Sequence, residues 1–142
     1  MKESNHKISL TIQTSPAAAW EIIGAVNGVD KWLAPITSCR VEGDKRYCTT
    51  EQGEFAEDIR NVDHKNRILQ YAIPSQNMIP VQNIEGEMRV LTAENGKTTI
   101  EWSWNYDVEE ANEASAKEAL TMVGTMGIQG IEALVNNAAV AG

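Results

Sequence analysis

The chain has 142 residues, enough for one domain with a sizeable core. Its 20 acidic residues against 12 Lys and Arg give a formal net charge of −8, which argues against a nucleic-acid backbone or an anionic membrane as the main partner. No apolar run approaches the ~20 residues that a membrane span needs, and residues 1–5 lack the apolar core of a secretory signal. We therefore expect a cytoplasmic protein whose two cysteines, Cys39 and Cys48, are reduced.

The first predicted element is a half-buried strand over residues 7–13, where polar and apolar side chains alternate. A helix is expected next over residues 16–25, capped by Thr14 or Ser15 and starting with a proline. The Asn-Gly pair at 27–28 is a typical left-handed helix stop.

A second short helix is expected over residues 29–33, before Pro35 breaks it. Six further strands follow, with their clearest turn signals at Gly43-Asp44 and Asn95-Gly96. These strands are predicted over residues 36–41, 46–50, 54–62, 67–73, 83–92 and 97–108. Because every connection after the second helix is short, we expect one antiparallel sheet of about seven strands.

The last predicted element is a long helix over residues 111–135, in which Ser115 and Glu118 form a capping box, followed by a frayed tail over residues 136–142. A helical wheel gives it an unusually wide apolar arc, made of Ala116, Leu120, Val123, Gly124, Gly127, Gly130, Ile131, Leu134 and Val135, with Met122 and Met126 on its flank. The three glycines each cost about 1 kcal/mol relative to alanine. They therefore indicate either close approach of the sheet or room for a ligand.

Several stretches, taken in order, carry a resemblance to a known family: Ser15-Pro-Ala-Ala-Ala-Trp-Glu-Ile-Ile23, Asp30-Lys-Trp-Leu33, Ile36-Thr-Ser-Cys-Arg-Val-Glu42, Glu57-Asp-Ile-Arg60, Ile68-Leu-Gln-Tyr-Ala-Ile73 and residues 98–106. With the element order, they resemble the START-like (SRPBCC) superfamily, and its polyketide cyclase/dehydrase-type members in particular. The resemblance implies an α+β helix-grip fold, in which a curved antiparallel sheet of about seven strands wraps around a long C-terminal helix and two short helices follow the first strand. It also implies that residues 1–142 form a single ligand-binding domain, with an apolar cavity between sheet and helix that a loop gates.

Strand alternation predicts which side chains would face such a cavity. On the last strand Ile100, Trp102, Trp104 and Tyr106 share one face, and this row either fills a core or borders a pocket. The full set expected to contact a ligand is Trp32, Phe55, Glu57, Ile59, Tyr71, Ile73, Met78, Arg89, Trp102, Trp104, Tyr106, Leu120, Val123, Met126 and Gly127.

Two charged residues of this set depend on details of the fold. Glu57 falls on the inner face of its strand, where a carboxylate is costly unless it is paired; a wet position at the rim is the alternative. Arg89 would point inward, within reach of Glu57, if Asn95-Gly96 formed a strict two-residue turn. A one-residue bulge, which we favour because it packs better, would instead turn Ile84, Met88 and Val90 inward.

The loop over residues 74–82 carries Met78, Ile79, Pro80 and Val81, which indicates a lid or an interface unless a strand starts there. Trp32 is expected either at the opposite lip or packed on a helix. Cys39 and Cys48 lie directly opposite each other if Gly43-Asp44 is the turn, so a disulfide could form under oxidising conditions, although we favour free thiols.

No metal or cofactor site is predicted, because His6 and His64 lack ligand spacing and His64 falls in a polar turn as a solvated residue. The leading hypothesis is binding of a small hydrophobic molecule, lipid- or polyketide-like, oriented by Glu57 or Tyr71. The alternatives are a polyketide cyclase/dehydratase-like enzyme, with Glu57 as general acid/base and Tyr71 as hydrogen-bond donor, and a module that binds a protein partner. The sequence does not define the ligand or the oligomeric state.

Overall fold

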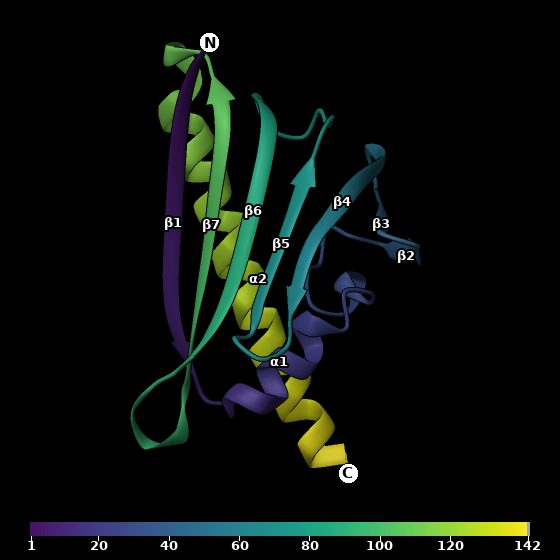
Figure 1. Cartoon of the computed structure of the whole chain (residues 1–142), viewed down its shortest axis with the longest axis vertical. Coiled ribbons are helices and arrows are strands. Elements are labelled where there is room, and N and C mark those ends of the chain that lie inside the picture. Colours follow the sequence, from purple (N-terminus) through teal and green to yellow (C-terminus); the bar gives the residue numbers. More distant parts are fainter. Residues whose placement is uncertain (142) are drawn as a thin grey trace.

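A computed structural model describes residues 1–141 and shows a curved antiparallel sheet laid against a long C-terminal helix (Figure 1). The seven strands lie in the order β1-β7-β6-β5-β4-β3-β2. Their bounds are β1 Lys2–Ile12, β2 Ser38–Glu42, β3 Lys45–Thr50, β4 Gly53–Asp63, β5 Ile68–Ile73, β6 Val81–Thr92 and β7 Thr98–Val108. The helices are α1 Pro16–Gly24, α2 Glu113–Ala141 and the 3-10 helices η1 Val29–Lys31, η2 Glu94–Gly96 and η3 Glu110–Asn112. The predicted helix-grip fold is thereby confirmed.

The first elements follow the predicted order with shifted bounds. β1 begins at Lys2, five residues before the predicted start, because its polar end pairs with the end of β7. Ser15 caps α1, since its Oγ accepts a hydrogen bond from the Ala18 amide at 3.2 Å. The second helix is a single 3-10 turn, η1, rather than the helix expected over residues 29–33.

Helix α1 contacts the turn between β4 and β5. The Trp20 indole N–H donates to Nδ1 of His64 at 3.1 Å, and the two rings meet edge to face. His64 is exposed at its turn, as expected, but it also holds α1 in place. Beyond α1, Val26 adopts a left-handed conformation with φ 68°, which is uncommon for a β-branched residue.

The bounds of the terminal helix differ from the prediction at both ends. It begins at Glu113, after η3, and Ser115 lies within its first turn, where its Oγ donates to the Asn112 carbonyl at 3.0 Å instead of capping. The helix continues to Ala141, so the tail expected over residues 136–142 is wrong up to that point; residue 142 lies outside the described part. Alanines, which have the highest helix propensity, extend it there.

The glycines of α2 mark close contact rather than room for a ligand. A β carbon at Gly124 would lie 2.3 Å from Ile8 Cδ1, and one at Gly127 would lie 2.8 Å from the Trp102 ring. At Gly130 it would lie 1.8 Å from the backbone oxygen of Trp32. The sheet and the segment after η1 therefore lie too close to the helix for an undisplaced β carbon at these three positions. Within the described residues, no helix is long and apolar enough to cross a membrane.

Gly130→Ala is expected to lower the free energy of unfolding by about 2 kcal/mol, because severe overpacking against a backbone atom outweighs the gain of about 1 kcal/mol in helix propensity. Chemical denaturation measures this change. Glu118→Ala, on the exposed strip of the same helix, is the control and should change stability little. A Gly130→Ala protein more stable than wild type would contradict the close contact.

Candidate functional site

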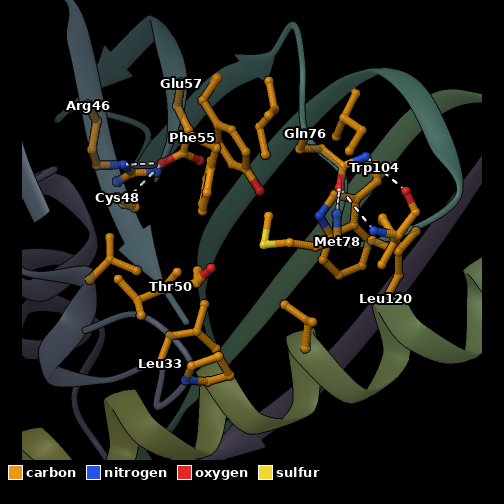
Figure 2. A pocket seen from close by; sticks show the side chains of 18 of the residues that line it. Leu33, Arg46, Cys48, Thr50, Phe55, Glu57, Gln76, Met78, Trp104 and Leu120 are labelled. Carbon is orange, nitrogen blue, oxygen red and sulfur yellow. Dashed lines mark hydrogen bonds and ion pairs between the residues drawn. The ribbon is translucent and has the colours of Figure 1, made fainter. Parts of the chain in front are cut away.

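A mostly apolar cavity of about 140 Å³ lies between the inner face of the sheet and α2. Figure 2 shows Arg46 and Glu57 at one end, Trp104 and Leu120 toward the other, and Met78 between them. Its walls come from η1 and the segment after it, from β3 to β7, from the β5–β6 loop and from α2. This is the space that the sequence predicted between sheet and helix.

Most of the residues expected at a ligand site border this cavity: Trp32, Phe55, Glu57, Tyr71, Ile73, Met78, Trp102, Trp104, Leu120 and Val123. The aromatic row of β7 faces inward and is buried, as strand alternation predicted. That these side chains contact a ligand stays a prediction, because the structure defines only their positions.

Four of the predicted residues do not border the cavity: Ile59, Tyr106, Met126 and Gly127. Ile59 and Tyr106 pack into the core outside the cavity wall. Gly127 is covered by the Trp102 and Trp32 rings. Met126 lies on the flank of α2 with 38% of its surface exposed, because the sheet covers a narrower arc of the helix than the wheel suggested.

Arg89 is the fifth residue of the expected set that does not border the cavity. The β6–β7 register pairs Arg89 with Glu101 and Met88 with Trp102. Arg89 is therefore turned outward, where its Nε donates to Glu87 at 2.7 Å, and Ile84, Met88 and Val90 are buried. This is the bulged register that packing favoured, and the inward alternative for Arg89 is excluded.

The buried partner of Glu57 is Arg46, which the sequence analysis did not identify. Arg46 Nε donates to Glu57 Oε1 at 2.6 Å, and each residue is only 5% exposed. Arg46 Nη1 also donates to the carbonyl of Val26 at 2.7 Å, so the ion pair ties the left-handed backbone after α1 to β3 and β4. The alternation of side chains along β3 could have identified Arg46, because it lies two residues before Cys48 and shares its buried face.

Tyr71 lies beside this pair with its phenol deep in the fold. Its Oη accepts a hydrogen bond from Trp102 Nε1 at 2.9 Å. The ring lies across Gly86, where a β carbon would come within 2.2 Å of the phenol carbon Cζ. Burial, followed by the charge of Glu57, raises the pKa of Tyr71, so the phenol keeps its proton at neutral pH.

The β5–β6 loop, residues 74–80, forms part of the cavity wall. Met78 and Ile79 border the cavity from this loop, whereas Val81 already belongs to β6. The side chain of Gln76 holds the loop together: its Oε1 accepts from the amides of Met78 and Ile79, and its Nε2 donates to the carbonyls of Ile79 and Val81. The strand-start interpretation is thus excluded for Met78 and Ile79, and the lid role remains a prediction.

Trp32 belongs to the wall of the cavity rather than to an exposed lip. It is buried, and its ring meets Trp102 edge to face with centroids 6.0 Å apart. The same residue contacts α2 at Gly127 and Gly130. Trp32 therefore packs on the helix, which was the alternative expectation.

Cys39 and Cys48 are paired across β2 and β3, as the Gly43-Asp44 turn predicted, and both are free thiols with their sulfur atoms 2.7 Å apart. Cys48 borders the cavity, and its thiol donates to Glu57 Oε1 at 3.7 Å. Burial raises the pKa of both thiols.

Comparison with known proteins places this geometry in a family. A family model described as polyketide cyclase / dehydrase and lipid transport matches residues 5–138. The chain belongs to this family. No curated protein matches it.

Solved structures share the fold at low sequence identity. An uncharacterised protein from Bacillus thuringiensis is 21% identical with a TM-score of 0.83, covering 93% of this chain and 98% of its own. The protein XoxI from Bacillus cereus is 22% identical with a TM-score of 0.83, covering 97% and 98%. A Thermobifida fusca protein is 15% identical with a TM-score of 0.80, covering 94% and 93%.

Glu57→Ala is expected to lower the free energy of unfolding by about 3–5 kcal/mol, because it leaves the guanidinium of Arg46 buried without a counter-charge. Denaturant titration measures the loss. Asp58→Ala is a matched control one residue along β4, since its ion pair with Lys45 has the same 2.6 Å length but is solvent-exposed and should matter far less. Equal effects of the two substitutions would contradict a buried pair.

Both thiols are expected to react slowly with Ellman's reagent at neutral pH, because a raised pKa keeps them protonated and the thiolate is the nucleophile. The rate should increase as the pH rises. Protein unfolded in guanidinium serves as the control and should react fast. Rapid modification of the folded protein at pH 7 would show that the thiols are exposed.

Proposed function

We propose that this protein binds a small, mostly apolar molecule in the cavity between its sheet and α2. The observation that carries the proposal is an apolar cavity of about 140 Å³ with a buried ion pair at one end. Apolar walls with a few convergent polar groups are typical of small-molecule sites. The family to which the chain belongs, described by cyclase, dehydrase and lipid-transport activities, supports a ligand of this kind.

Burial of the ligand would supply most of the affinity. At about 25 cal/mol per Å², removing about 200 Å² of apolar ligand surface from water contributes about 5 kcal/mol. The polar groups at the Glu57 end would orient the ligand more than they strengthen its binding. The β5–β6 loop would act as the lid, because Met78 lies at the cavity with 38% of its surface exposed.

A second candidate function is catalysis, favoured by the position of a carboxylate and a phenol on one cavity wall. Glu57 would act as general acid/base, and Tyr71 would donate a hydrogen bond to a substrate carbonyl. The hydrogen bond from Arg46 occupies one oxygen of Glu57, which leaves the other for a substrate. Mass analysis of the bound molecule after incubation distinguishes conversion from binding alone.

The test is a thermal-shift and native mass spectrometry screen with fatty acids, monocyclic phenols and aromatic polyketides. A ligand that binds only the folded state should raise Tm in proportion to ln(1 + [L]/Kd). Val123→Phe, which fills the cavity from α2, should weaken binding at least about tenfold by excluded volume. Met126→Phe is the matched control on the same helix, because Met126 lies outside the cavity.

Equal binding by wild type, Val123→Phe and Met126→Phe would place the ligand elsewhere. If no compound in the screen bound the wild-type protein, the proposed function would fail.

A further inference from the structure

We infer that the cavity takes a molecule the size of one substituted ring, whose polar end is an uncharged hydroxyl, as in a phenol. The inference rests on the proposed function and narrows it from apolar molecules in general to one chemical class. Three features of the cavity carry it: its volume, its aromatic wall and the free hydrogen-bonding groups at its polar end.

The volume limits the buried part of the ligand. About 140 Å³ is close to the size of a protein cavity of about 150 Å³ that holds benzene. A six-membered ring with one or two small substituents therefore fits. A long acyl chain or a fused-ring polyketide does not, as long as the β5–β6 loop keeps its position.

The wall suits a flat, apolar ring. The rings of Trp102 and Trp104 are stacked, with their planes inclined by 29° and their centroids 5.1 Å apart, and both border the cavity from β7. Phe55 projects into the same space from β4 (Figure 2). Aromatic pairs favour offset-stacked or edge-to-face contact, and both arrangements are open to a ring that enters between these elements.

The polar end carries no net charge, because Arg46 and Glu57 neutralise each other at 2.6 Å. A ligand carboxylate or ammonium group bound there would add an uncompensated charge to a buried site, which is costly. The ligand's polar group is therefore uncharged.

Besides the N–H groups of Arg46 that have no partner among residues 1–141, one donor and one acceptor remain free at this end. Tyr71 Oη accepts the indole N–H of Trp102, and among residues 1–141 no acceptor takes its own proton. Glu57 Oε1 accepts hydrogen bonds from Arg46 and Cys48. Its other oxygen, Oε2, has no hydrogen-bond partner among residues 1–141. Both residues are at least 95% buried and border the cavity. A hydroxyl can both accept from Tyr71 and donate to Glu57, which are the two roles that these groups leave open.

The test compares four probes by isothermal titration calorimetry at pH 7: 4-methylphenol, toluene, benzoate and palmitate. We expect 4-methylphenol to bind at least about tenfold more tightly than toluene, which has the same ring but leaves the buried polar groups unpaired. Benzoate and palmitate should bind more weakly than 4-methylphenol.

Tyr71→Phe should bring 4-methylphenol to within about threefold of toluene, because it removes the donor and keeps the ring. Tyr106→Phe is the matched control: it removes a buried hydroxyl outside the cavity wall and should leave the preference intact. If Tyr71→Phe does not fold, as judged by circular dichroism, the comparison of 4-methylphenol with toluene on the wild-type protein decides the hydroxyl assignment.

The outcomes separate the two proposals. Equal affinities of wild type for 4-methylphenol and toluene would overturn the hydroxyl assignment. Tighter binding of palmitate or benzoate than of 4-methylphenol would overturn the ligand class. In both cases the proposal that the cavity binds a ligand would stand. Binding of no probe here and of no compound in the broader screen would overturn the proposed function as well.

Discussion

The close approach of α2 to the sheet is the constraint on which the cavity depends. At Gly124, Gly127 and Gly130 the helix has no side chain to hold its neighbours off, so Ile8, three indole rings and the backbone of Trp32, directly after η1, come close to it. Leu120 and Val123 lie on the preceding part of the helix, beside the space that remains. The glycines thus close one region of the interface, and the cavity is what the larger side chains and the curvature of the sheet leave open.

The buried ion pair at the end of this cavity is a costly way to stabilise a fold, since well-packed apolar residues are often as good or better. Arg46 and Glu57 nevertheless link three parts of the chain: the left-handed backbone at Val26, the β2–β3 hairpin and β4. Such a pair holds a carboxylate and a guanidinium in a fixed orientation inside an apolar space, which is a property of use to a ligand site. The Tyr71 phenol belongs to the same arrangement. It accepts a hydrogen bond from Trp102, and its ring lies over Gly86, where any side chain would displace it.

The errors in the predicted site share a physical origin. Ile59 and Tyr106 were expected at the cavity because they share a face with residues that border it, and alternation says nothing about how far along a strand a cavity extends. Arg46 was overlooked because its role depends on the ion pair with Glu57 on the next strand. Arg89 was included because its orientation depends on one residue of register at the turn between β6 and β7. The predicted capping box at Ser115 is wrong because α2 begins at Glu113, two residues before Ser115 and directly after η3. Ser4 Oγ donates a hydrogen bond to the Glu113 carboxylate at 2.8 Å at this helix start.

Local patterns in the chain were sufficient to determine the order of elements, the antiparallel sheet and the inward aromatic row of β7, because periodicity and turn chemistry act over a few residues. The helix-grip architecture was implied by the resemblance to the START-like superfamily. The tertiary structure alone decided where the cavity ends, which charges are paired and that the glycines of α2 serve close packing. These properties depend on atoms that are distant in the chain and meet only when the sheet curves onto the helix, so no short stretch of sequence contains them.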